Sequence, residues 1–191
     1  MKNGLLGVLL MISSLLGFTQ NDSVFTNLEE AIKAGPNVKV LILKKQKLSE
    51  FPLEILELEN LHTLDLHKNK ITVIPSEINT LVNLKNLDLS RNKIDSLPKE
   101  LGDLEQLEKL KLHHNSFRNL PSSFGKLSNL NYLDVDFTNI KTIPVEMGNC
   151  KKLLFFNARH SYIDEDGIKT IKYILPKDCV KLFPQTCNCN S

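Results

Sequence analysis

The segment LVNLKNLDLSRNKIDSLPKEL, residues 81–101, places seven leucine or isoleucine residues in twenty-one positions. Their spacing fits neither a helix nor a strand alone. The flanking segments LENLHTLDLHKNKITVIPSEI (58–78) and LEQLEKLKLHHNSFRNLPSSF (104–124) show the same pattern after a shift of twenty-three residues. A repeat of about 20 to 50 residues indicates a solenoid or another array of stacked units.

Several columns of residues keep this register along the chain. One column holds only proline, one holds asparagine or another small polar residue, and two hold large apolar residues. These columns are Pro52, Pro75, Pro98, Pro121, Pro144; Gln46, Asn69, Asn92, Asn115, Thr138, Ser161; Leu48, Ile71, Ile94, Phe117, Ile140, Ile163; and Ile55, Ile78, Leu101, Phe124, Met147. The shared register is too regular to arise by chance.

Each repeat has a simple physical interpretation. In LHTLDLHKN, residues 61–69, apolar and polar residues alternate, which is typical of a half-buried strand. The amide of Asn69 can bind backbone groups of the turn that follows. Pro75 then fixes the backbone, and the three-residue spacing of Ile78 and Leu81 indicates a short helical or 3₁₀ segment. A single unit cannot bury these side chains, so each unit needs its neighbours.

The pattern L-x-x-L-x-L-x-x-N-x-I-x-x-[IL]-P-x-x-[IL], found at 61–78 and 84–101, resembles the leucine-rich repeat. The twenty-three-residue length and the LP step are similar to the class of Scribble-like proteins, plant Ras-group-related proteins and many bacterial repeat proteins. The resemblance covers about residues 38–163. It implies an α/β repeat solenoid, curved like a horseshoe segment, with a parallel β-sheet on the concave face and short helical or 3₁₀ segments on the convex face.

The two ends depart from the repeat, as the ends of solenoids do. Thr26 and Glu29 have the spacing of a capping box, and Gly35-Pro36 ends the helix that they would begin. Asp164 is the expected N-cap of a second helix that ends at Pro176. The expected organisation is a signal peptide (1–20), an N-terminal helical cap (21–37), five to six repeats (38–163), a helix–strand cap (164–183) and a tail (184–191).

The first twenty residues have the pattern of a secretory signal peptide. Lys2 precedes an uncharged apolar run over 4–18, which is shorter than the roughly 20 residues of a membrane span. Cleavage is expected near Thr19 or Gln20, with an uncleaved anchor as the alternative. Because the first cysteine is Cys150, the lipoprotein pattern is absent. The protein is therefore expected to be secreted, periplasmic or on the cell surface, without stable membrane insertion after cleavage.

Composition favours one soluble domain and offers no catalytic motif. With 191 residues, 41% hydrophobic residues and a net charge of 24 minus 22, or +2, the chain suits neither a membrane protein nor a disordered one. Interleaved charges argue against nucleic acid as the partner. We find no phosphate-binding loop, nucleophile elbow or zinc-protease motif. The sequence therefore predicts no enzyme, no cofactor and no metal site.

The histidines and cysteines carry weaker signals. His113 and Asp136 are expected to be cross-strand neighbours, but two ligands are fewer than a metal site needs, so a surface histidine is favoured. Cys150 continues an apolar column and is expected in the core, and Cys179 in the C-terminal cap. Cys187 and Cys189 fall in the tail. Four cysteines allow three full pairings, and a disulfide in the cap or tail stays open.

The outward-facing columns of the concave sheet converge on aromatic residues towards the C-terminus. Tyr132, Phe137 and Phe155 come together there, in the company of charged and imidazole side chains. Exposed aromatic residues next to arginine are common at protein interfaces. The alternative is that the two phenylalanines pack under the C-terminal cap. The predicted partner-binding residues are Lys111, His113, Tyr132, Asp134, Asp136, Phe155, Arg159 and His160.

These patterns predict an exported, monomeric, non-enzymatic module that recognises a protein partner on its concave surface. The alternative is a structural or assembly protein of the cell envelope that acts through the solenoid edges or the cysteine-containing tail. Leucine-rich repeats serve unrelated roles, so the resemblance names no partner.

Overall fold

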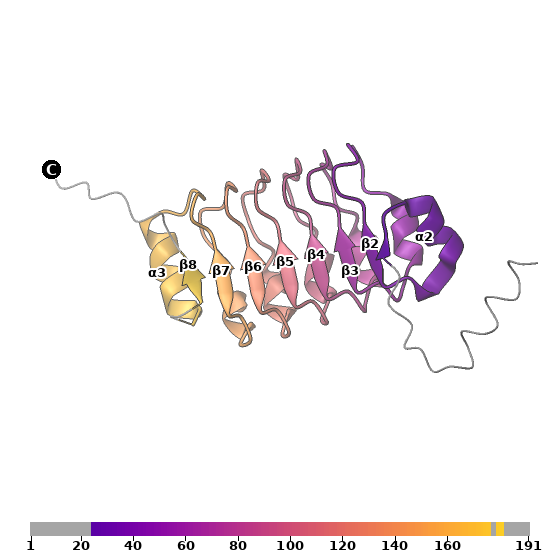
Figure 1. Ribbon diagram of the computed structural model, residues 1–191. Coiled ribbons are helices and arrows are strands. Elements are labelled where there is room, and N and C mark those ends of the chain that lie inside the picture. The colour runs from indigo at the N-terminus through magenta and orange to yellow at the C-terminus, as the bar shows by residue number, and fades with distance from the viewer. Residues whose placement is uncertain (1–23, 177–178, 182–191) are drawn as a thin grey trace, which may run out of the picture.

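The computed structural model describes residues 24–176 and 179–181. Within them, eight short strands form one parallel sheet whose spatial order is the order of the chain (Figure 1). The strands are β1 (Val24–Phe25), β2 (Val40–Ile42), β3 (Thr63–Asp65), β4 (Asn86–Asp88), β5 (Lys109–Lys111), β6 (Tyr132–Asp134), β7 (Phe155–Asn157) and β8 (Val180–Lys181). The predicted repeat solenoid is confirmed.

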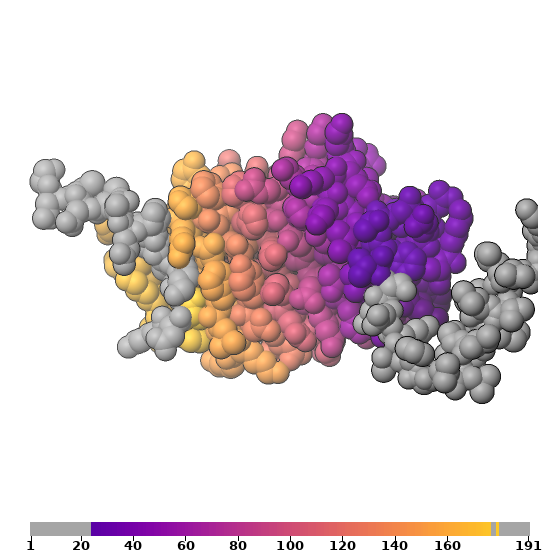
Figure 2. Space-filling view, viewed as in Figure 1, coloured from indigo at the N-terminus to yellow at the C-terminus, as the bar shows by residue number. Residues whose placement is uncertain are grey.

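The return segment of each repeat forms a short 3₁₀ helix on the convex side, as expected. Each begins directly after a column proline, whose extended backbone and missing N–H suit that position. The 3₁₀ helices are η2 (Gly35–Asn37), η3 (Leu53–Glu57), η4 (Ser76–Thr80), η5 (Lys99–Asp103), η6 (Ser122–Lys126) and η7 (Val145–Asn149), of which η2 belongs to the N-terminal cap. In the space-filling view the coils form continuous bands of colour in chain order (Figure 2).

The core is a stack of identical layers. Leu64 pairs in register with Leu87, and Leu87 with Leu110, and each of these side chains is at most 1% exposed. Burying a leucine side chain contributes roughly 1.5 to 3 kcal/mol. The proline-linked column from Ile55 to Met147 is fully buried as predicted. Stability therefore comes from contacts between neighbouring coils.

The asparagine column joins consecutive coils through buried hydrogen bonds. The Asn69 side-chain oxygen accepts hydrogen bonds from the amides of Gln46 and Leu48, at 2.9 and 3.1 Å. Its nitrogen donates to the carbonyls of Leu43 and Leu66, at 2.9 and 2.8 Å. One side chain thus satisfies backbone groups in two coils. Asn92 and Asn115 repeat the arrangement.

The asparagine ladder ends at Thr138. Its hydroxyl donates to the Val135 carbonyl of its own coil at 2.6 Å and pairs with the Ser161 hydroxyl at 3.2 Å. By the geometry of the ladder, an asparagine here would bind the carbonyl of Leu112 and the amide of Phe117 in the preceding coil. Threonine is too short to do so. The β5–β6 boundary therefore lacks the asparagine ladder hydrogen bonds of the boundaries before it.

The sequence pattern of residues 61–69 suggested that each strand continues up to the residue before the asparagine column. In the structure that residue lies beyond the end of the strand. Strands are three residues long, and the chain then enters a left-handed turn with φ between 50° and 61°. Such a conformation is unfavourable for side chains other than glycine, asparagine or aspartate. The residues concerned are Lys45, Lys68, Arg91, His114 and Phe137, and Lys47 also has φ of 61°.

The N-terminal cap differs from its prediction in two respects. Helix α2 (Leu28–Ala34) is capped by Asn27, whose side chain accepts from the Glu30 amide at 3.1 Å, so the expected Thr26–Glu29 box is wrong by one residue. The helix packs against β1 and η3. The cap also contains strand β1, which the sequence analysis did not expect and which pairs with β2.

The C-terminal cap follows its prediction. Helix α3 (Glu165–Ile174) begins after Asp164, whose carboxylate accepts from the Gly167 amide at 2.8 Å, and β8 adds the expected final strand. A Cβ atom on Gly167 would lie 2.2 Å from the Lys141 carbonyl oxygen, so only glycine fits this approach. No helix within the described residues has the length and apolar character needed to cross a membrane.

Both described cysteines lie where the sequence predicted. Cys150 is a free thiol, 1% exposed, and burial raises its pKa to about 11. Cys179 is buried in the cap and its thiol donates to the Pro176 carbonyl at 3.0 Å. Cys187, Cys189 and the predicted signal peptide lie outside the described residues.

Completing the ladder should stabilise the protein. We expect Thr138→Asn to raise the free energy of unfolding by about 1 kcal/mol, because it adds hydrogen bonds to groups that already lie in place. This corresponds to an increase in Tm of about 2 to 4 °C, measurable by calorimetry. The reverse change, Asn115→Thr, should cost about 1 to 3 kcal/mol. A Tm for Thr138→Asn below that of the wild type would contradict the ladder account.

Candidate protein-binding surface

Two aromatic stacks flank the concave face of the last strands. Tyr132 of β6 stacks on Phe155 of β7, with ring centroids 4.5 Å apart and planes within 8°. The Lys109 ammonium lies 5.5 Å from the Tyr132 ring centre. Because stacked strands bring equivalent positions together, one aromatic residue per coil builds a continuous row.

The second stack forms in the turns at the strand ends, where His114 and Phe137 are left-handed. Phe137 lies between His114 and His160, with centroid distances of 4.5 and 4.1 Å. Phe137 is 47% exposed. Offset and stacked rings of this kind contribute roughly 0.5 to 1.5 kcal/mol beyond their area burial. The two aromatic stacks therefore border the polar side chains of β6 and β7.

Asp136 holds the second stack in place. One oxygen of its carboxylate accepts from the Phe137 amide at 3.0 Å, the His160 amide at 2.7 Å and the His160 imidazole Nδ1 at 2.9 Å. The same carboxylate thus fixes both the backbone and the ring orientation of His160. The sequence analysis expected Asp136 to face His113. Instead, His113 Nδ1 lies 2.9 Å from His114 Nδ1.

Asp134 lies between the two stacks and is only 9% exposed. It accepts hydrogen bonds from the Asp136 amide at 3.0 Å and from the Asn157 side chain at 3.1 Å. Burial raises the pKa of its carboxyl group. Asp134 therefore supports the surface more than it forms its outer edge.

The remaining predicted residues differ in how exposed their side chains are. Lys111 is half-buried and forms an ion pair with Asp88 at 3.2 Å, so it is partly engaged within the fold. Arg159 and His160 are exposed, and His160 is part of the second stack. Helix α3 packs against η7 on the convex side, and Phe137 remains exposed. The structure thus favours an exposed aromatic surface over one hidden beneath the cap.

Sequence reasoning did not select His114 and Phe137 as site residues, although it noted Phe137 among the aromatic residues of the outward-facing columns. The missing information was the turn conformation, which a strand pattern does not encode. A second cluster, Asp65, His67 and Asp88, was also overlooked, and its ligand atoms lie within 4.8 Å of one another. Within the described residues these groups already have partners, because His67 binds Asp65 at 2.7 Å and Asp88 binds Lys111.

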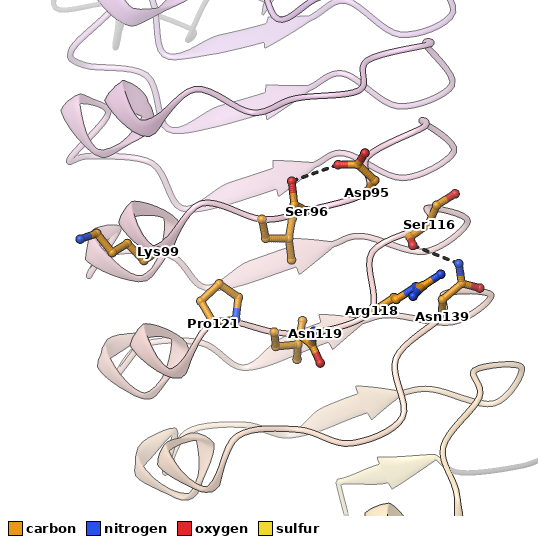
Figure 3. A pocket seen from close by; sticks show the side chains of 10 residues that line it. Asp95, Ser96, Lys99, Ser116, Arg118, Asn119, Pro121 and Asn139 are labelled. Carbon is orange, nitrogen blue, oxygen red and sulfur yellow. Dashed lines mark hydrogen bonds between the residues drawn. The ribbon is translucent and has the colours of Figure 1, made fainter.

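An open pocket of about 750 Å³ is lined by residues from the coils of β4, β5 and β6 (Figure 3). Asp95, Ser96, Arg118 and Asn139 line it, and Asn139 donates to the Ser116 carbonyl at 3.0 Å. Its lining contains no histidine or cysteine. Nothing in this arrangement indicates a reacting group.

Two protein-family models match most of the repeat region. A family described as "Leucine-rich repeat region" matches residues 76–171, and one described as "Leucine Rich Repeat" matches 60–81. No curated protein matched the chain.

Solved structures agree with the fold. A leucine-rich repeat protein of Leptospira interrogans is 32% identical, with a TM-score of 0.61, over 77% of this chain and 43% of that one. The plant peptide hormone receptor RGFR1, solved in complex with RGF2, is 28% identical, with a TM-score of 0.59, over 66% and 21%. An internalin of Listeria monocytogenes, 22% identical, has a TM-score of 0.65 over 78% and 41%. The matched region thus spans less than half of each of these proteins.

The paired histidines predict a pH-dependent loss of stability. Burial, and then the positive charges of Arg91 and His113, lower the pKa of His114 below its ordinary value of 6.5. Because the pKa of His114 is lower in the folded protein, the unfolded chain takes up the proton more readily. The free energy of unfolding therefore falls as the pH drops below the ordinary histidine pKa of 6.5. We expect His114→Asn to lose less stability than the wild type between pH 7.5 and pH 5.5 in urea titrations.

Lys68→Asn is the matched control for this experiment. It occupies the same left-handed turn position and relieves the same backbone strain, but removes no imidazole. Its stability loss between the two pH values should equal that of the wild type. Equal losses in all three proteins would contradict the role of His114.

Proposed function

Because the chain belongs to the leucine-rich repeat family, we propose that it is an exported, non-enzymatic module that binds a protein partner on its concave surface. The binding residues are those of the C-terminal coils. They comprise the predicted set Lys111, His113, Tyr132, Asp134, Asp136, Phe155, Arg159 and His160, together with the newly recognised His114 and Phe137.

The observation that carries this proposal is the pair of aromatic stacks, one on β6 and β7 and one in the turns that follow β5, β6 and β7. Aromatic residues and arginine are enriched where protein partners bind most tightly. Tyr132 and Phe155 form a stacked, half-buried aromatic pair, and Arg159 is an exposed cation in the coil of Phe155. A broad surface of this kind suits a polypeptide better than a small ligand, which prefers an enclosed pocket.

The backbone at Phe137 supports a functional reason for that side chain. Its φ of 50° lies in the left-handed region, where a bulky residue is strained by about 1 to 3 kcal/mol. Asparagine or glycine would occupy this turn at a lower cost. A ring that is strained and 47% exposed contributes little to folding, so recognition is the better explanation for its presence.

The similarity to the plant receptor supports a peptide as the form of the partner. That receptor was solved with the hormone RGF2, and its identity to this chain is 28%. Export is proposed from the pattern of residues 1–20, in which Lys2 precedes an uncharged apolar run. The absence of catalytic motifs in the sequence is the basis for a non-enzymatic role.

The proposal can be tested with a photo-cross-linking residue. We expect p-benzoylphenylalanine at Tyr132 or Phe137 to label a partner in extracts of the producing cell and its medium, because both side chains lie on the proposed surface. The same group at Tyr173, a 90% exposed residue of α3, is the control and should give no labelled band. Labelled bands are read by mass spectrometry.

Competition separates specific recognition from non-specific labelling. Excess unlabelled wild type should abolish the cross-link. The double variant Tyr132→Ala/Arg159→Ala should compete at least about tenfold less well, because a tenfold change in affinity corresponds to the loss of about 1.4 kcal/mol of binding free energy. Its Tm should fall by no more than about 4 °C. Equal competition by the variant would refute this assignment of the surface.

A further inference from the structure

The turns at the strand ends of β2, β3 and β4 carry six exposed cations, which we call the basic edge. Three of them occupy the left-handed position of each turn, and three follow two residues later. The basic edge consists of Lys45, Lys47, Lys68, Lys70, Arg91 and Lys93. All six are exposed, and both columns keep the twenty-three-residue period.

The fold concentrates these charges. The turns that follow the arrowheads of the strands run side by side along one edge of the solenoid (Figure 1). Hydrogen bonds from the Lys68 amide to Ser90, at 2.9 Å, and from the Arg91 amide to His113, at 2.8 Å, tie the turns together. Neighbouring strands lie about 4.8 Å apart, so three coils place six positive charges within roughly 10 Å along the stack.

No acidic side chain of the described residues forms an ion pair with the basic edge. The lysine ion pairs of the neighbouring coils involve lysines outside the basic edge, as in Lys111–Asp88 and Lys126–Asp103. Many acidic residues of the same coils lie on the 3₁₀ helices instead. They include Glu54, Glu57, Glu77, Glu100 and Asp103. The small net charge of +2 therefore conceals a local cluster of positive charge at the basic edge.

Backbone conformation gives a second, independent indication. Lys45, Lys47, Lys68 and Arg91 have φ between 54° and 61°. Asparagine would suit these turns better, and electrostatic repulsion among adjacent cations adds a further cost. Strained residues with no structural partner concentrate at functional sites. The basic edge is thus a surface that folding alone does not explain.

We infer that the basic edge binds an anionic polysaccharide. A row of separated cations matches the sulfate or carboxylate groups of an extended sugar chain. Residues 44–48, 67–71 and 90–94 contain no Phe, Tyr or Trp on which unpaired bases could stack, which disfavours single-stranded nucleic acid. They also contain no exposed large apolar side chain that could enter a membrane.

This inference is independent of the proposed protein-binding surface. In the same turn position, the cations of β2–β4 give way to His114 and Phe137 in the coils of β5 and β6. The two surfaces therefore occupy different coils, and they meet where the charge of Arg91 acts on His114.

Binding can be measured with dextran sulfate, using uncharged dextran as the matched probe with the same backbone. We expect the purified protein to bind dextran sulfate at 0.05 M salt, with affinity falling steeply as salt rises, and to ignore dextran. The triple variant Lys45→Asn/Lys68→Asn/Arg91→Asn should bind at least about tenfold more weakly, while its Tm should not fall, since asparagine suits these turns. Polygalacturonate distinguishes carboxylate from sulfate as the preferred group.

The control removes the same amount of charge elsewhere. Lys33→Asn, Lys151→Asn and Lys169→Asn, combined, change three exposed lysines of α2, the turn after η7 and α3. This control should bind dextran sulfate within about twofold of the wild type. Equal weakening of the two triple variants would overturn the inference, and so would tighter binding to a single-stranded oligonucleotide or to anionic vesicles at 0.15 M salt.

Discussion

The structure depends on Asn69, Asn92 and Asn115, each of which links its coil to the one before it. Each side chain can bind two carbonyls and one or two amides, which would otherwise lie inside the solenoid without partners. An unsatisfied buried backbone group costs about 1 to 3 kcal/mol, so a change of register by even one residue would be expensive in every coil. Leucine layers supply most of the stabilisation, but they tolerate sliding more than directional hydrogen bonds do. The ladder therefore sets the period at which the layers stack.

The same constraint determines where functional side chains can be placed. Before reaching each ladder position, the chain turns through a left-handed residue, and this residue is solvent-accessible in the coils of β2, β3, β4 and β6. The sequence could place asparagine or glycine at these positions without strain. It instead has Lys68, Arg91 and Phe137 among others, which divide one edge into a cationic part and an aromatic part. A rigid core and strained, exposed turns are thus two consequences of one repeating unit.

Much of the fold could be predicted from the sequence because its period is visible in several independent columns. The proline column located the 3₁₀ helices, and Asp164 located the start of α3. The candidate binding surface was harder to predict from the sequence. Whether Phe137 was covered depended on the packing direction of α3, and the partners of Asp136 depended on the left-handed turn, neither of which has a strong sequence signature. The N-cap was misplaced from Asn27 to Thr26 because both are acceptable capping residues one position apart.

The central claim is that twenty-three residues form one interchangeable coil whose register is fixed by the ladder. Deletion of residues 84–106 removes one whole coil and leaves every column in register, whereas deletion of 84–103 removes twenty residues and breaks it. Chemical denaturation followed by circular dichroism tests this directly. The account predicts a single cooperative transition for the first deletion, at a lower denaturant concentration than for the wild type, and no cooperative transition for the second. If both deletions unfold alike, the account is contradicted.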